Sequence, residues 1–336
     1  MVDFTAKAVC DSISPTGDRL LTMQLRYPKF IHGELMTHRV FSRNASSSRA
    51  IPTSKYLEEV RSPTLRAQPH FWGKNQKGMQ AAEELNDVPY IAPPKDIGLG
   101  LGILVSETIP TSDKQRAQKL WHDAALTAAS FAEEMNRLGA HKQIVNRLLE
   151  PFVHINVLVS ATEYMNFFGL RLDKHAQPEI KVLAENMWRV YNESRPKALQ
   201  PGEWHLPYID EEDEELSTAI MNYHLQYGTY IDELNIKCSV ARCARVSYLS
   251  FETGRKPTLE EDLKLYDRLM GAQPLHASPA EHQATPDDWR ADGLIGHREY
   301  WCHPDQHGNF SGWRQYRKML PGESEAPLPA EYTKAG

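Results

Sequence analysis

The sequence is organised around one polar segment, Thr37-His38-Arg39-Val40-Phe41-Ser42-Arg43-Asn44-Ala45-Ser46-Ser47-Ser48-Arg49. It holds one His, three Arg, one Asn and four Ser, so it offers neither a helix face nor a strand face for packing. Arginine presents a fixed fork of donors to phosphates and carboxylates, and serine hydroxyls with backbone N–H groups complete an anion site. A solvated loop is the ordinary interpretation. Because apolar residues flank the segment, at Leu35–Met36 and Ile51–Pro52, we favour a site held between ordered elements.

Composition limits the class of protein. The 336 residues allow one large domain or two ordinary ones, with apolar and charged fractions typical of a soluble globular protein. The net charge of −6 argues against a general binder of nucleic acid polymers, although a local basic site for a mononucleotide remains open. The chain shows no membrane-length apolar run and no signal pattern, which predicts a cytoplasmic protein without a membrane partner. Its four Cys lack zinc-site spacing, so we expect reduced thiols and no metal.

Around the polar segment, the pattern predicts a strand over 18–32 and two helices further on. Alternation of Leu21, Met23, Leu25 and Tyr27 gives the strand one buried face. Residues 53–110 are expected to form a surface loop with a short helix around 78–86, and a lid is the less favoured alternative. Residues 112–138 predict a long helix with a core stripe, and residues 142–150 a second helix carrying Arg147. The predicted core stripe consists of Leu120, Ala124, Ala128, Phe131, Met135 and Leu138.

The remaining segments supply three further patterns. Residues 160–180 predict an apolar helix ending near Gly169, a corner, and a new helix from Pro178 with Ile180 to Val190 facing the core. Residues 193–235 resemble a linker whose acidic run, 210–215, starts a helix. Thr258 and Glu261 form a capping box ahead of His276-Ala277-Ser278-Pro279-Ala280-Glu281-His282. For these two histidines alone, a structural hydrogen bond is favoured over metal ligation.

These motifs resemble those of the flavin-dependent thymidylate synthases, the ThyX family. The polar segment is similar to the family signature R-H-R-x-x-S-x-N-x-x-S-x-R-Y. Residues 166–180 match a second family motif, N-F-x-x-L-R followed by A-Q-x-E-I. Residues 244–247 and 276–282 match two more, A-R-V-S and H-x-S-P-x-E-H. The positions that depart from the family pattern are Glu34, Thr37, Ala45, Ala50, Ser160 and Thr162. In the family the last two motifs come first in the chain, so this sequence resembles a circular permutant, which nearby termini permit.

The resemblance implies an α+β, ThyX-like fold, with a mixed or antiparallel central sheet carrying long helices. Its domains would be 1–192 with the signature and the Asn/Arg helix, a linker or acidic insert at 193–235, 236–284 with the other two motifs, and a C-terminal extension at 285–336. That extension is aromatic and basic around Trp313 to Lys318. A packed structural tail is favoured there, and a cover over the site is the alternative. A homotetramer is expected, because family members build each site from several subunits.

The resemblance also implies the chemistry and the residues that carry it. FAD would deliver a hydride and methylenetetrahydrofolate one carbon to C5 of a pyrimidine deoxynucleotide monophosphate, dUMP by default, with NADPH as electron donor. Arg171 and His276 are the expected catalytic residues. The expected substrate-binding residues are Glu34, Ser47, Ser48, Arg49, Arg147 and Arg171. The expected cofactor-binding residues are His38, Arg39, Ser42, Asn44, Ser160, Asn166, Ser247, His276, Ser278 and Glu281.

Two alternatives stay open at the level of the sequence, because the departures cluster at flavin and nucleotide positions. One is the same chemistry on another pyrimidine nucleotide, such as methylation or hydroxymethylation of dCMP. The other is a derivative that binds nucleotide or flavin without turnover. Retained flavin without activity on dUMP would favour the first, and loss of flavin affinity in an intact fold would favour the second.

Overall fold

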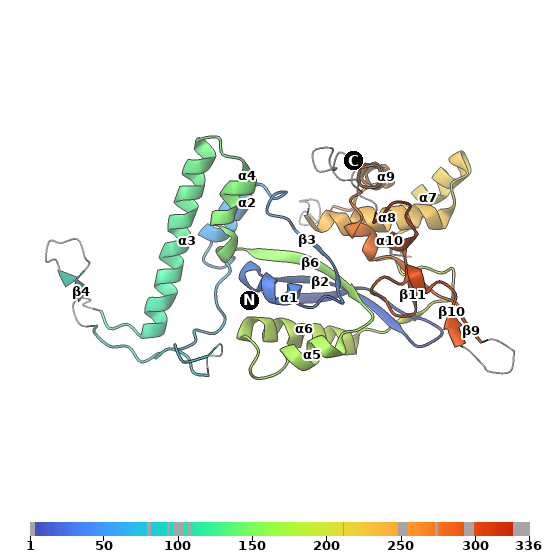
Figure 1. Ribbon diagram of the computed structural model, residues 1–336. Helices are drawn as coiled ribbons and strands as arrows, with labels where there is room; N and C mark the ends of the chain where they lie inside the picture. Colours follow the sequence, from blue (N-terminus) through green and yellow to red (C-terminus); the bar gives the residue numbers. More distant parts are fainter. Residues whose placement is uncertain are drawn as a thin grey trace, which may run out of the picture.

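The computed structural model describes residues 4–78, 82–92, 95–96, 104–105, 109–210, 212–247, 255–272, 275–291 and 299–324. Its centre is a five-stranded sheet in the order β3-β6-β2-β1-β7 (Figure 1). The strands are β1 (Thr5–Ile13), β2 (Arg19–Pro28), β3 (Ser42–Ala45), β6 (His154–Ala161) and β7 (Lys197–Ala198). All neighbours pair antiparallel except β1 and β7, which are parallel. The expected mixed sheet is therefore confirmed.

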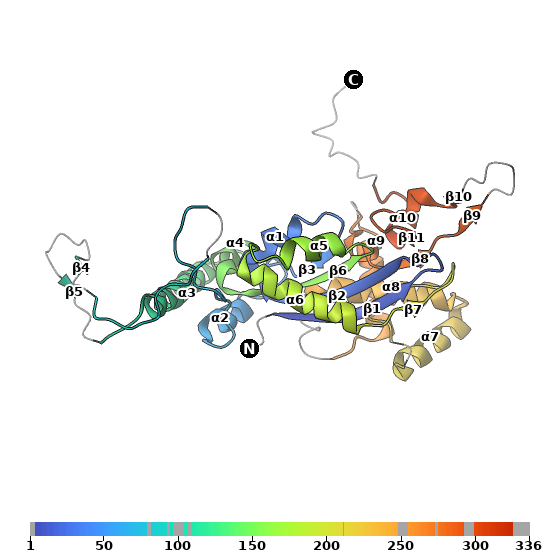
Figure 2. The same cartoon turned by 90° about the horizontal axis from the view of Figure 1, so that it is seen from below.

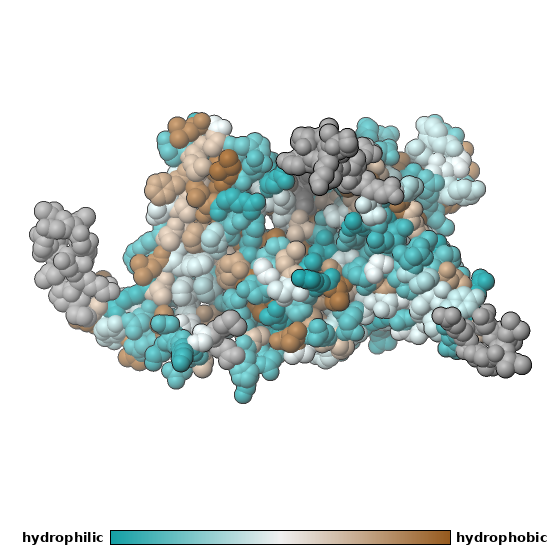
Figure 3. Space-filling model, viewed as in Figure 1, coloured by the Kyte–Doolittle hydropathy of each residue, from teal (hydrophilic) through white to brown (hydrophobic). Residues whose placement is uncertain are grey.

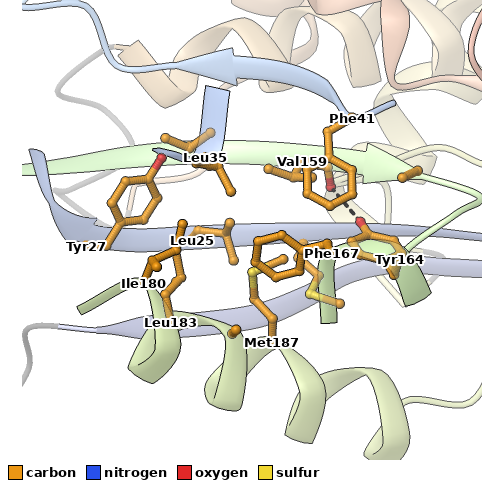
Figure 4. Close-up of a cluster of buried hydrophobic side chains, with 14 of the residues drawn as sticks. Leu25, Tyr27, Leu35, Phe41, Val159, Tyr164, Phe167, Ile180, Leu183 and Met187 are labelled. Carbon is orange, nitrogen blue, oxygen red and sulfur yellow. Dashed lines mark hydrogen bonds between the residues drawn. The ribbon is translucent and has the colours of Figure 1, made fainter. Parts of the chain in front are cut away.

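The predicted strand over 18–32 is β2, and its alternation places it in the core. Leu21, Met23, Leu25 and Tyr27 are all fully buried against α5 (Met165–Arg171) and α6 (Pro178–Glu193). Figure 4 shows the side chains of Leu25 and Tyr27 beside those of Ile180, Leu183 and Met187 from α6. The core face predicted for α6 is also buried, and Pro178 occupies its first turn. After Pro28 the chain turns through the 3₁₀ helix η1 (Lys29–Ile31) into α1 (His32–Met36), directly ahead of the polar segment.

The opposite face of the sheet is covered by the C-terminal half of the chain (Figures 1 and 2). Its helices are α7 (Glu214–Tyr227), α8 (Ile231–Ala244), α9 (Leu259–Met270) and α10 (Tyr316–Met319), with the 3₁₀ turns η4 (Arg245–Ser247), η6 (Ser278–Glu281) and η7 (Pro304–Gln306). The small strands are β8 (Ala284–Pro286), β9 (Trp289–Ala291), β10 (Glu299–Trp301) and β11 (Trp313–Gln315). Asp213 caps α7, as the acidic run predicted, and Thr258 with Glu261 forms the predicted capping box of α9. The extension packs through Trp313, which is fully buried.

One end of the molecule is built by α2 (Thr53–Arg61), α3 (Asp113–Arg137) and α4 (Lys142–Val145), followed by the 3₁₀ turns η2 (Asn146–Leu148) and η3 (Glu150–Phe152). Helix α3 confirms the long helix, and Ala128 and Met135 of its predicted core stripe pack against the core, but the rest of the stripe is wrong. Leu120, Phe131 and Leu138 are 69%, 62% and 78% exposed, whereas small alanines face α2 and α4. Alanine permits close helix packing, so the bulky side chains point outward, and brown apolar patches lie among polar residues over α3 in Figure 3.

Three further expectations need correction. Ser160 and Ala161 end strand β6 instead of starting a helix, because the β-branched run before them favours a strand, and α5 continues past Gly169 to Arg171. Residues 53–61 form α2, which the loop interpretation missed, and residues 82–86 are not helical. The helix expected over 142–150 breaks into α4, η2 and η3. The short strands β4 (Lys95–Asp96) and β5 (Leu104–Val105) pair with each other, and the rest of 93–108 lies outside the described residues.

Candidate functional site

Strand β3 divides the polar segment between the two faces of the sheet, because successive side chains of a strand point to opposite sides. Ser42 and Asn44 face the C-terminal half: the Ser42 hydroxyl donates to Oδ1 of Asn309 at 3.1 Å, and Asn44 Nδ2 donates to the Cys243 carbonyl at 2.7 Å. Arg43 instead donates from Nη1 to the carbonyls of Met36 and His38, at 2.9 and 3.3 Å. Ser42 and Asn44, two of the residues expected to bind cofactor, therefore lie on the same face of β3 and contact the C-terminal half of the chain.

Arg171 and His38 form the centre of the first cluster. Arg171 Nε donates to Nε2 of His38 at 2.9 Å, which assigns the His38 proton to Nδ1. Arg171 Nη2 donates to the Thr37 hydroxyl at 3.1 Å and to the Glu34 carbonyl at 3.4 Å. Burial, and then the charges of Arg171 and Arg43, lower the pKa of His38 to about 4, so its imidazole is neutral at neutral pH. The pair holds the guanidinium at a fixed angle, and no described residue accepts a hydrogen bond from its Nη1.

A second cluster surrounds the predicted phosphate-binding loop. Ser48 is buried and donates to Oε1 of Glu150 at 2.5 Å, while Lys29 Nζ reaches Glu150 at 2.8 Å and the Ser48 hydroxyl at 3.0 Å. Arg147 Nη1 joins the same carboxylate oxygen at 2.9 Å. Burial raises the pKa of Glu150, but hydrogen bonds from Lys29 and Ser48 bring it below its ordinary value. Burial lowers the pKa of Lys29.

Ser47 and Arg49 are exposed at the rim of this cluster, so their side chains are accessible to a ligand. The sequence interpretation missed Lys29, which lies outside the signature motif and directly follows Pro28. The sequence feature that could have identified Lys29 is its position directly after a buried strand, where a cationic side chain lies close to the turn that follows. Arg43 was also missed as an anchor of the loop.

The remaining expected residues lie where the C-terminal half meets β3. Side chains of His276 and Ser278 are exposed, and η6 lies against β3. Glu281 pairs with Arg317 of the C-terminal extension. Ser247 ends η4, and only its backbone is described. Asn166, on α5, is exposed.

Ser160 belongs to a buried chain of hydrogen bonds that crosses the sheet. Its hydroxyl lies 2.6 Å from that of Thr22 and 2.8 Å from Nδ1 of His282. Thr22 continues to Nε2 of His205 at 2.8 Å, and His205 Nδ1 ends the chain at the Ser12 hydroxyl, 2.9 Å away. All five residues are buried, and burial lowers the pKa of both histidines to about 3. The network joins the segment expected to be a linker to the last motif, so the predicted structural role of His282 is confirmed.

The family resemblance implies FAD, and the available groups fit such a cofactor in part. Ser42, Asn44, Ser160 and Glu281 already use their polar groups within the chain. Arg39 and Arg171 supply cationic donors, and His276 and Ser278 supply accessible polar groups. Oε2 of Glu34 is buried without a partner in the described residues, which indicates a missing ligand or neighbouring chain. Cationic donors of this kind suit the phosphate groups of a nucleotide.

Comparison with known proteins identifies the family to which the chain belongs. A family model described as "Thymidylate synthase complementing protein" matches residues 14–197, more than half of the chain. The matched region contains β2, the polar segment and the Arg171 helix. The protein is therefore a thymidylate synthase-like methyltransferase by class. The chain belongs to the thymidylate synthase complementing protein family, which confirms the resemblance to the flavin-dependent enzymes.

Solved structures show a weaker likeness. The UMP/dUMP methylase PolB from Streptomyces cacaoi bound with 5-Br dUMP is 16% identical with a TM-score of 0.40, covering 57% of this chain and 91% of that chain. The same methylase bound with 5-Br UMP gives 17% identity, a TM-score of 0.41, and coverage of 57% and 90%. These values are too low to assign a substrate. No curated protein matches the chain.

Among the described residues, none of the helices is long and apolar enough to cross a bilayer. The same residues contain no group of three or more His, Cys, Asp or Glu side chains placed to hold a metal ion.

Proposed function

We propose that the protein methylates a pyrimidine deoxynucleotide at C5, with dUMP as the default substrate, using FAD, methylenetetrahydrofolate and NADPH. The observation that carries this proposal is the Arg171–His38 pair. A neutral imidazole, the Thr37 hydroxyl and the Glu34 carbonyl fix the guanidinium while leaving Nη1 available. A preorganised cation of this kind stabilises charge that develops on a pyrimidine carbonyl oxygen during the reaction.

The other residues are assigned to binding. Ser47, Arg49 and Arg147 would hold the nucleotide phosphate, with Lys29 and Ser48 fixing the loop through Glu150. Arg39, His276 and Ser278 would contact FAD, which supplies the hydride when bound. Ser42, Asn44 and Ser160 are assigned to holding the last two motifs against the sheet.

The circular permutation remains part of the proposal. In the family order, the H-x-S-P-x-E-H motif would continue directly into β2. One contact supports this: Ala284, just after the motif, packs in one cluster with Leu20 at the start of β2. Proximity of the two cut ends is what a permuted chain requires.

The visible absorption spectrum tests the cofactor. We expect bands near about 370 and 450 nm to travel with the protein after FAD is added, as for any bound oxidised flavin. The protein should then be reduced with NADPH, and reoxidation followed with methylenetetrahydrofolate and dUMP, dCMP or UMP. Turnover with dUMP supports the default substrate, and turnover only with dCMP supports the first alternative. A folded protein that takes up no FAD contradicts the proposed FAD-dependent reaction and favours the binding derivative.

A homotetramer is proposed as the assembly, and the exposed stripe of α3 supports it. Leu120, Phe131 and Leu138 present a row of apolar side chains at helical spacing, which a monomer would leave in water. Replacing Leu120 and Phe131 with Glu should lower the molar mass measured by light scattering from four chains to two or one, because buried unpaired carboxylates oppose association.

The matched control places the same two charges elsewhere on α3, through Gln118→Glu and Asn136→Glu, at positions that are exposed and off the stripe. That variant should keep the mass of the unmodified protein. An unchanged mass in the stripe variant would contradict a role for α3 in assembly.

A further inference from the structure

The C-terminal extension forms one wall of a cleft whose opposite wall is the polar segment. The cleft has a volume of about 450 Å³ and is lined by Arg39 and Arg43 on one side and by Asn309, Arg317 and Lys318 on the other. Glu281 also lines it. Nothing in the family signature accounts for the second wall, because it comes from residues beyond the last motif.

The extension is fixed in this position by polar contacts on both sides. Asn309 Nδ2 donates to the Val40 carbonyl at 2.7 Å, and Gln315 Nε2 donates to the Glu281 carbonyl at 2.9 Å and to the Ser42 hydroxyl at 3.2 Å. Gly308 has a φ of +60°, and a Cβ there would lie 2.6 Å from Oε1 of Gln315. The positive φ favours glycine at this turn.

Charge gives the cleft its chemical preference. Four cations line it, and two carboxylates balance them in part: Glu281 pairs with Arg317, and Glu323 accepts from Lys318 Nζ at 2.6 Å and from Arg317 Nε at 2.8 Å. Arg39 is exposed and has no charged partner among the described residues. The excess positive charge, with forked donors on facing walls, suits a phosphate or pyrophosphate group.

We propose that the C-terminal extension makes this cleft a binding site for the phosphate groups of a nucleotide, with Arg39 and Lys318 as principal contacts. This inference rests on the proposed function, which determines the nucleotides that could occupy the cleft. The pyrophosphate of the flavin dinucleotide and the 2′-phosphate of the nicotinamide donor share the required chemistry, and they are separated by the test.

Inorganic pyrophosphate is the first probe, titrated by calorimetry into the full chain and into Lys318→Gln and Arg39→Gln. Each variant should bind pyrophosphate about tenfold more weakly, because one charge-assisted contact is lost. Lys318→Arg should restore binding. Arg314→Gln is the matched control, since Arg314 lies on the same extension but donates to Gln306. Equal affinity in the unmodified chain and both cleft variants would overturn the proposal.

Two arms then identify the source of the phosphate. If the variants lose affinity for FAD but keep the ratio of KM for NADPH to KM for NADH, the flavin pyrophosphate occupies the cleft. If the variants raise the KM for NADPH but leave the KM for NADH and the affinity for FAD unchanged, the 2′-phosphate of NADPH occupies the cleft. Pyrophosphate binding needs no turnover, so the two proposals can fail separately. If the cleft variants bind pyrophosphate more weakly but the unmodified protein methylates no pyrimidine nucleotide, the cleft proposal stands and the proposed function is rejected. If the unmodified protein methylates a pyrimidine nucleotide but the cleft variants bind pyrophosphate as tightly as it does, the proposed function stands and the cleft proposal is rejected.

Discussion

Replacing Arg171 with alanine is expected to reduce kcat/KM for the pyrimidine nucleotide on the order of a thousandfold, the usual effect of removing a charge-stabilising donor. Nε and Nη2 of this guanidinium are held by His38, Thr37 and Glu34, so the side chain loses no freedom when substrate binds. Arg171→Lys should recover little, because an ammonium cannot reproduce the fork. Steady-state kinetics with the nucleotide, at saturating folate and NADPH, measures the loss.

The control for this prediction is Arg189→Ala on the neighbouring helix α6. Arg189 is exposed, and among the residues that the structure describes it pairs only with Glu193 four residues on, so its removal should leave kcat/KM unchanged. Flavin uptake and circular dichroism should match the unmodified protein in both variants. An Arg171→Ala enzyme within a few-fold of full activity would show that the pyrimidine is polarised by another group.

The buried histidines predict a marked loss of stability in mild acid. Burial lowers the pKa of His205 and His282 to about 3, whereas an unfolded histidine titrates near about 6.5. Between these two pKa values the unfolded state binds more protons than the folded state, so the free energy of unfolding rises with pH. The stability that the two neutral histidines contribute is fully present above the unfolded pKa and is lost as the pH falls below it. Each histidine contributes about 1 kcal/mol per pH unit, or on the order of 3 kcal/mol for both between pH 6.5 and 5.

Urea unfolding at several pH values between 7.5 and 5 measures this slope. His282→Asn is the informative variant, because an amide can keep the hydrogen bond to Ser160 but does not titrate. It should halve the slope, and adding His205→Asn should nearly remove it. A slope in the double variant as steep as in the unmodified protein would assign the acid sensitivity to other groups.

The site was accessible from the sequence only where motif and chemistry coincide. Arg171 with His38, and Ser48 beside Arg147, were named from their motifs, and the structure brings each pair into a cluster. Ser42, Asn44 and Ser160 were expected to surround a cofactor. The sequence has no information on which face of the sheet they occupy until the β3–β6 register is known.

Local sequence by itself determined the elements whose signal is short-range: the alternation of β2, the Pro178 start of α6, the acidic start of α7 and the capping box at Thr258. These depend on residue spacing and nearby hydrogen bonds, which the sequence states directly. Tertiary structure alone decided the buried His205–His282 chain, the outward side of α3 and the second wall of the cleft. Each depends on which distant surfaces meet, because burial and charge pairing are properties of contacts between segments far apart in the chain.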